Sequence, residues 1–341
     1  MKIALVIPVY NEQESLPRLI SLLANLCQKS GYEFQWIFVN DGSTDSSTEI
    51  LLKSAISDNR IRIIQFTRNF GHQAAVTAGL DYACADAVIV MDADLQDPPE
   101  LIWEMINKFQ EGFDIVSPQR LSRIGESRFK LWTASAFYRL MTTLVDQRMQ
   151  PQVSDFRLYG KVAVYGMRQF REHHRFLRGM AAWLGLKEAV IPFHRAPRLA
   201  GKTKYNTRKM LKFAWTAISS FSVLPLKCAT VLGVFVILLG VTYFGYAFYM
   251  QFGTAGDVPG WTFLACLQII LSGLTLLSLG VMGDYIGRIY EESKGRPLYL
   301  IRNLVNLEPV DLPRSIVLNE HNLPQDLLGS GIHRSEASSN G

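Results

Sequence analysis

Carboxylate and amide side chains follow three apolar runs of the chain, in a pattern suited to chemistry on a phosphorylated substrate. The densest group, Asp92-Ala93-Asp94-Leu95-Gln96, comes directly after the apolar residues 87–91. Two carboxylates in a turn at a strand end can converge on one hard cation, and Mg²⁺ or Mn²⁺ prefers one or two carboxylates together with phosphate oxygens. We therefore expect Asp92 and Asp94 to form a metal pair that binds a diphosphate.

Two further polar clusters follow residues 3–9 and 34–39, namely Asn11-Glu12 and the segment 40–45, NDGSTD. Each has a structural explanation when taken alone, since Asn11 and Asp45 suit helix N-caps and Asp41-Gly42 suits a turn. Three acidic clusters at one sheet edge would repel one another unless a cation or a ligand satisfied them. The chain has neither GxGxxG nor GxxxxGK[ST], so we expect the metal to take the place of a glycine-rich phosphate loop.

The elements that must position these groups are strands and helices in alternation. Runs rich in Val, Ile and Phe recur at residues 3–9, 34–39, 61–66, 87–91 and 114–117, with helical patterns between them. This alternation predicts an α/β fold with a mostly parallel, Rossmann-like sheet and helices on both faces. Ligands of such sheets collect at the carboxyl ends of the strands, where the three polar clusters lie.

Two stretches near the C-terminus carry no charge, residues 228–256 and 258–283. A membrane-spanning helix needs about 20 apolar residues, so the sequence predicts transmembrane helices at 229–251 and 260–283. A buried pair of core helices is the alternative. The four cysteines have no metal-binding or redox spacing, and a chain of 341 residues needs no disulfide scaffold.

The basic charge is concentrated beside the first of these stretches. Residues 189–227 hold eight Lys or Arg and no acid, which exceeds the net charge of +5 for the whole chain. The remainder is therefore slightly acidic, and the patch predicts anionic lipid or phosphate, and no nucleic acid, as partner. The loop between the two stretches lacks Lys and Arg while both outer flanks are basic, which predicts cytoplasmic termini and a two-pass integral membrane protein. Residues 3–9 are too short for a signal-peptide core.

Six motifs in order resemble a known family. VIPVYNE, VNDGSTDSS, RNFGHQAAVTAGL and MDADLQDPPE are similar to the motifs of inverting family 2 glycosyltransferases with the GT-A fold. SDFRLYGK, RAPRLAGKTKY and the two-helix hairpin resemble, more narrowly, the polyisoprenyl-phosphate glycosyltransferases, among them bactoprenol glucosyltransferases and dolichol-phosphate mannose synthases. The resemblance covers about residues 1–300.

Hydropathy and resemblance together predict the domain organisation. A GT-A catalytic domain is expected over 1–204, with an amphipathic helix at about 126–145. An interfacial amphipathic helix over 205–225 would lead into the two spanning helices. The segment 284–341 is expected in the cytoplasm and disordered after about 320.

The resemblance also implies roles for single residues. The nucleoside of a sugar donor would be held by Pro8, Tyr10, Glu12, Val39 and Asp41. The metal would be held by Asp92, Asp94 and Gln96, with Ala93 also at the donor. Arg120 falls near the donor phosphates, and Arg198, Gly201 and Lys204 match a mobile loop that closes over the donor. Arg120, Arg128 and Lys130 are the residues implied for the lipid phosphate. His72 stands where many relatives have Lys, which leaves a phosphate role at that position open.

Asp155 and Asp94 are the residues to which the resemblance assigns catalysis. Asp155 is either a general base or a group that positions Arg157 or the acceptor. A turn ion pair with Arg157 is the structural alternative.

The reaction implied is inverting transfer of a hexose, with UDP-glucose the preferred donor, to a polyisoprenyl phosphate such as undecaprenyl or dolichyl phosphate, with Mg²⁺ or Mn²⁺ as cofactor. A processive polysaccharide synthase and a non-enzymatic nucleotide-sugar binding protein are the alternatives. The chain lacks the QxxRW motif and the additional spanning helices of the former. Partners expected besides the bilayer are further copies of the chain, through small residues of the second spanning helix, and a flippase for lipid-linked sugars.

Overall fold

The computed structural model describes residues 1–28, 31–120, 153, 155–193, 224–253, 260–308 and 315–317. The chain divides into two compact units. The first comprises Met1–Glu126, Gln150–Gly201 and Arg296–Gly341, and the second comprises Ser127–Met149 and Lys202–Gly295. The chain therefore leaves the first unit and returns to it after the two long helices.

The five strands predicted from the sequence are confirmed. They are β1 (Lys2–Val9), β2 (Glu33–Asn40), β3 (Ile61–Phe66), β4 (Ala87–Val90) and β5 (Ile115–Arg120). β1 pairs in parallel with β2 and β4, and β2 pairs in parallel with β3. β1 and β2 are buried along nearly their whole length, as expected for parallel strands covered on both faces.

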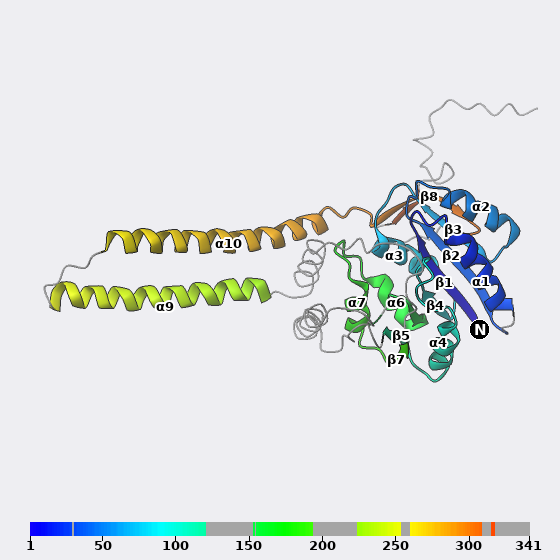
Figure 1. Cartoon of the computed structure of the whole chain (residues 1–341), viewed down its shortest axis with the longest axis horizontal. Helices are drawn as coiled ribbons and strands as arrows, with labels where there is room; N and C mark the ends of the chain where they lie inside the picture. The colour runs from blue at the N-terminus through cyan, green and yellow to red at the C-terminus, as the bar shows by residue number, and fades with distance from the viewer. Residues whose placement is uncertain are drawn as a thin grey trace, which may run out of the picture. The chain divides into compact units, whose positions relative to one another are not determined.

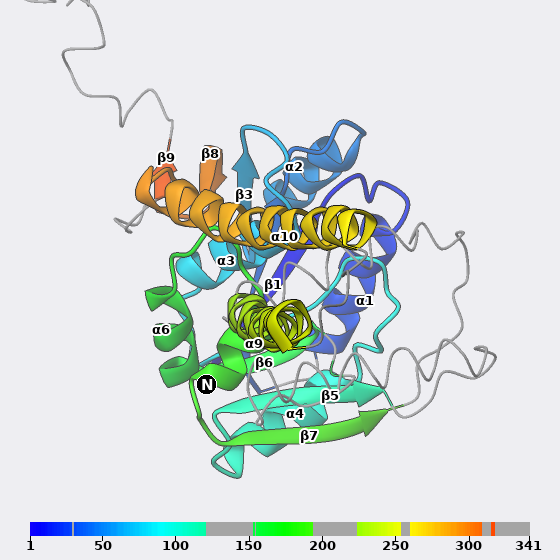
Figure 2. The ribbon, with the colours of Figure 1, turned by 90° about the vertical axis from the view of Figure 1, so that its left-hand side faces the viewer.

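Four more strands complete a sheet in the order β7-β5-β6-β4-β1-β2-β3-β8-β9. They are β6 (Arg157–Gly160), β7 (Glu188–Phe193), β8 (Tyr299–Val305) and β9 (Ser315–Val317). β6 runs antiparallel to both β4 and β5, and β8 runs antiparallel to β3. The sheet thus takes β8 and β9 from residues 284–341, which the sequence analysis separated from the catalytic domain. Figure 2 shows β5 and β7 along one edge and β8 and β9 at the other.

Helices cover both faces of this sheet, as predicted (Figure 1). α1 (Leu16–Gln28), α2 (Ser47–Ser57) and α4 (Leu101–Gln110) pack on the main apolar core. α3 (His72–Tyr82) and α6 (Lys161–Gln169) contact the sheet from the opposite side, and α7 (Leu177–Trp183) packs on α6. α3 approaches β1 closely, because a Cβ at Gly79 would meet Val6 Cγ1.

The second unit contains two long helices that contact each other, α9 (Leu224–Gly253) and α10 (Trp261–Ser293). Both are long and apolar enough to cross a membrane, and large apolar side chains such as Leu238 and Leu276 are exposed on them. α9 begins before the predicted residue 229, and α10 continues past the predicted residue 283. The predicted amphipathic helix at 126–145 and residues 205–223 of the second one lie outside the described residues, as does nearly all of the chain beyond 308. Residues 224 and 225, predicted to end that second helix, belong to α9.

Candidate active site

The loops that follow β1 and β2 are bound to each other by hydrogen bonds. The backbone N–H of Asn11 donates to Ser43 Oγ at 3.1 Å, and the N–H of Thr44 donates to Asn11 Oδ1 at 2.8 Å. Asn11 has a φ of +55°, a conformation that asparagine adopts more readily than most residues. These contacts hold the carboxyl ends of the two strands together, with Tyr10 exposed and Glu12 half-buried at the sheet edge.

Asp41 anchors the loop that leads into α3. Its carboxylate accepts hydrogen bonds from the backbone N–H groups of Phe70 at 2.6 Å and Gly71 at 2.9 Å. Burial raises the pKa of Asp41, and the two backbone donors oppose that rise. Gly42, with a φ of +68°, lies so close to Arg68 that a side chain there would meet its backbone. The structure thus gives Asp41 a loop-anchoring role, while its predicted contact with a nucleoside stays a prediction.

The segment after β4 forms a tight turn around the predicted metal pair. Leu95 has a φ of +56°, an uncommon conformation for a bulky residue that is typical of functional turns. The backbone N–H of Gln96 donates to Asp94 Oδ1 at 3.1 Å. Gln96 Oε1 is buried and accepts no hydrogen bond from the part of the chain that the structure describes. A buried amide oxygen without a hydrogen-bond donor can serve as a ligand of a cation, so the residue types here fit the predicted divalent metal.

Asp92 lies where acidic groups from separate elements meet. Burial raises the pKa of Asp92 to about 6, and the charges of Asp155, Asp94 and Asp97 act in the same direction. His72 at the start of α3 opposes this rise, with its Nε2 3.8 Å from Asp92 Oδ1. A cluster of carboxylates that raises the pKa of one member is the electrostatic setting that a bound divalent cation would relieve.

Among the residues that the structure describes, no three His, Cys, Asp or Glu side chains are grouped so that they could hold a metal ion. The predicted site offers two carboxylates and one amide instead. Mg²⁺ commonly binds through one or two carboxylates and takes its other ligands from substrate phosphates and water.

Asp155 pairs with Arg178, and the alternative of an ion pair with Arg157 is wrong. Arg178 Nε donates to Asp155 Oδ1 at 2.7 Å and Nη2 donates to Oδ2 at 3.0 Å. Although burial acts to raise it, the pKa of Asp155 is lowered, chiefly by Arg178 and further by His72 and Arg157. Arg157 is itself buried, and its Nη2 lies 3.7 Å from Glu188 Oε1.

The other predicted residues lie as follows. Pro8 and Val39 are register partners in β1 and β2, and Ala93 is buried. Glu12 is within electrostatic reach of Asp94, and burial raises the pKa of Glu12. Arg120 ends β5, where it is in register with Phe193. The side chain of Arg120 and the residues Arg128, Lys130, Arg198, Gly201 and Lys204 lie outside the described part of the chain.

The sequence analysis missed Arg178 and gave His72 no definite role. A signal for His72 was present, because RNFGH follows the third predicted strand and so falls at the same sheet edge as the acids. Arg178 carried no comparable signal, since it is one of four arginines between residues 168 and 178.

The chain is similar to several known proteins. A family model described as glycosyl transferase family 2 matches residues 4–170. The chain is 43% identical to the uncharacterized glycosyltransferase YkcC of Bacillus subtilis, across 89% of this chain and 94% of that protein. It is 41% identical to the uncharacterized glycosyltransferase sll0501 of Synechocystis, across 92% and 99% of the two chains. It is 39% identical to the bactoprenol glucosyl transferase of Shigella phage SfV, across 89% and 99%.

Among solved structures, the chain is similar to glucosyl-3-phosphoglycerate synthase from Mycobacterium tuberculosis in complex with Mn²⁺, UDP-glucose and phosphoglyceric acid. It is 17% identical, covers 64% of this chain and 78% of its own, and has a TM-score of 0.41. The predicted fold class and the predicted enzyme class are both confirmed by the sheet and by the relatives together. The chain belongs to glycosyltransferase family 2.

Proposed function

We propose that this glycosyltransferase moves glucose from UDP-glucose to the phosphate of a membrane polyisoprenyl phosphate. The product would be a β-linked polyprenyl-phosphate glucose, formed with inversion at the anomeric carbon. The observation that carries the proposal is the meeting of Asp92, His72 and Asp155 beside the Asp94–Gln96 turn. The similarity to proteins named bactoprenol glucosyl transferase supports both the sugar and the acceptor.

A divalent cation, Mg²⁺ or Mn²⁺, is proposed as cofactor. Asp92, Asp94 and the buried Gln96 Oε1 are the groups of this chain that would hold it. When bound, the cation would offset charge on the departing diphosphate. The chain's own residues would keep the carboxylates at fixed positions, because Leu95 and the Gln96–Asp94 hydrogen bond set the shape of the turn.

The acceptor's chemistry fits a site without a strong base. A phosphate monoester has a second pKa near 6 and is largely a dianion at neutral pH. An oxygen of this dianion forms the new bond to the anomeric carbon while the bond from that carbon to the UDP oxygen breaks, and UDP leaves with the electron pair. No proton must be removed from the acceptor. Catalysis would then rest on alignment and on offsetting the negative charge of both phosphorylated groups.

The two long apolar helices support a location at the membrane. Polyprenyl phosphate keeps its chain in the bilayer and its headgroup at the surface, so the active site must be held at that surface. We propose that α9 and α10 span the membrane and that both termini lie in the cytoplasm, where nucleotide sugars are made. Association with further copies of the chain and with a flippase that moves the lipid-linked sugar belong to the same proposal.

An assay with purified full-length protein in nanodiscs tests the function. The protein would be given undecaprenyl phosphate, Mg²⁺ or Mn²⁺ and labelled UDP-glucose, with GDP-mannose and UDP-GlcNAc as parallel donors. We expect labelled sugar in a butanol-soluble product that mild acid releases, and none after EDTA treatment. Label in a polymer would support a processive synthase instead, and nucleotide-sugar binding without transfer would support a binding protein.

A further inference from the structure

Arg178 forms a bidentate ion pair with Asp155, in which each carboxylate oxygen accepts one hydrogen bond from the guanidinium group. The two hydrogen bonds measure 2.7 and 3.0 Å, and each side chain retains about a quarter of its exposure, 25% for Asp155 and 29% for Arg178. Bidentate pairs of this kind fix the orientation of the carboxylate as well as its charge. The pair thus stands at an accessible position in the site, unlike the buried Arg157.

The helix that carries Arg178 is fastened to α3. Gln73 Oε1 in the first turn of α3 accepts a hydrogen bond from the backbone N–H of Leu177, the residue before Arg178, at 3.1 Å. The neighbour of Gln73 in that turn is His72, which faces Asp92. One turn of α3 therefore contacts both the metal pair and the support of Arg178.

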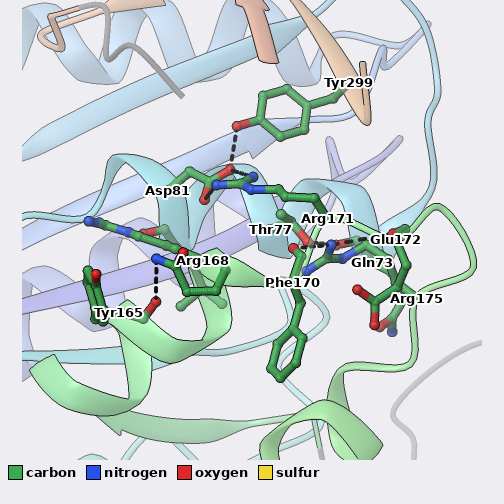
Figure 3. A network of polar contacts seen from close by, with 12 residues as sticks. Gln73, Thr77, Asp81, Tyr165, Arg168, Phe170, Arg171, Glu172, Arg175 and Tyr299 are labelled. Atoms are coloured by element: carbon green, nitrogen blue, oxygen red, sulfur yellow. Dashed lines mark hydrogen bonds and ion pairs between the residues drawn. The ribbon is translucent and has the colours of Figure 1, made fainter. Parts of the chain in front are cut away.

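The segment that leads to α7 is fastened to the other end of α3 (Figure 3). Arg171 forms a bidentate pair with Asp81 at 2.7 and 2.8 Å, and Tyr299 of β8 donates to the same carboxylate at 2.7 Å. Arg168 donates to the backbone carbonyls of Leu80 and of the residue that follows α3. Leu177 and the segment before it are thus both bonded to α3, which fixes the N-terminal end of α7, where Arg178 lies.

The charges around Asp155 oppose its protonation. The pKa of Asp155 is lowered by Arg178 of α7, His72 of α3 and Arg157 of β6. The charge of Asp155 in turn raises the pKa of Asp92. A carboxylate with a lowered pKa is a poor proton acceptor at neutral pH. An acceptor that arrives as a phosphate dianion also has no proton for Asp155 to take.

We infer that Arg178 is a positioning residue that, supported by the first turn of α3, holds Asp155 as a fixed carboxylate beside the metal pair and not as a general base. The inference rests on the proposed glucose transfer. Arg178 acts through Asp155, so the two residues form one functional unit. Loss of either member should therefore impair the same step.

A double-mutant cycle in nanodiscs tests this unit, using Arg178→Ala, Asp155→Asn and the double variant. We expect each single change to lower kcat, the double variant to be no slower than the slower single one, and a coupling of about tenfold to a hundredfold between the two. Guanidinium ion should restore part of the activity of Arg178→Ala. Arg178→Lys, which keeps the positive charge but cannot form the bidentate pair, should have a kcat between those of the unaltered protein and Arg178→Ala.

Two readouts separate positioning from a general loss of structure. Binding of UDP with Mn²⁺, followed by the electron paramagnetic resonance of the metal, should match the unaltered protein in Arg178→Ala. Arg60→Lys, which loses a comparable Arg–carboxylate pair with Asp58 outside the site, should keep its kcat. Independent, multiplicative effects of Arg178→Ala and Asp155→Asn would overturn the inference, as would an unchanged kcat in Arg178→Ala. An unaltered protein that transfers no sugar from any donor would instead overturn the proposed function, and the inference with it.

Discussion

Gly42 offers the sharpest test of how the donor-side loops are assembled. It has a φ of +68°, and a Cβ at this position would lie 2.5 Å from the carbonyl carbon of Arg68 and 2.7 Å from the nitrogen of Asn69. Both atoms belong to the backbone of the loop anchored by Asp41. Gly42→Ala therefore has to displace that loop as well as adopt a left-handed conformation.

The two costs can be estimated separately. The left-handed conformation costs an alanine about 1–2 kcal/mol relative to glycine. Forcing an extra methyl group into a packed site typically costs about 1–3 kcal/mol more. We expect Gly42→Ala to lose about 2–5 kcal/mol in free energy of unfolding, as the sum of these terms.

Gly112 provides the matched control. Its φ is +94°, but a Cβ there meets nothing within 4 Å, so Gly112→Ala should lose only the conformational term of about 1–2 kcal/mol. Thermal unfolding of the two variants in the same detergent measures the difference. Affinity for UDP with Mn²⁺ should fall in Gly42→Ala, because the displaced loop carries the two N–H groups that Asp41 binds, and should stay unchanged in Gly112→Ala. Equal unfolding temperatures and equal UDP affinities would refute the close approach of these loops.

Three further predictions concern the metal pair and the network at α3. Asp94→Ala should abolish turnover and metal-dependent UDP binding together, and tight Mn²⁺-dependent binding in that variant would contradict the metal assignment. Because the pKa of Asp92 is raised to about 6, protonation competes with the metal below that pH, so Mn²⁺ affinity measured by calorimetry should fall about tenfold at pH 5 relative to pH 7.5. An ordinary carboxylate would change little over that range. Tyr299→Phe removes a buried donor to Asp81 and should lower the free energy of unfolding by about 1.5–3 kcal/mol. Tyr165→Phe, whose side chain is exposed, should have no effect on thermal unfolding.

Much of the fold could be predicted because its strands are buried on both faces. A strand of that kind must be a nearly continuous apolar run, and β1, β2 and β4 have this pattern. The parallel arrangement then explains why the charge of Asp94, far from Glu12 in sequence, helps to raise the pKa of Glu12 at one edge of the sheet. The expectation of an acidic cluster followed from this geometry alone.

The partners of the four arginines between residues 168 and 178 could not be predicted from the sequence, because tertiary packing determines them. Arg168, Arg171, Arg175 and Arg178 lie within 11 residues and are chemically alike. In the folded chain the first donates to carbonyls at the end of α3, the second pairs with Asp81, the third donates to the carbonyl of Phe170, and only the fourth reaches Asp155. No spacing rule distinguishes them, because their partners come from other elements.

The chain returns to the sheet of the first unit after α10. β8 pairs with β3, and Tyr299 at its start stacks on Phe66, with ring centroids 5.2 Å apart. Phe66 in turn contacts the ring of Phe70, whose backbone N–H binds Asp41. The residues that follow the second long helix therefore help to hold the loop beside the candidate donor site. The helices α9 and α10 lie in the chain between β7 and β8. A chain that ends before α9 would therefore lack β8, and with it part of the packing that holds the loop of the candidate site.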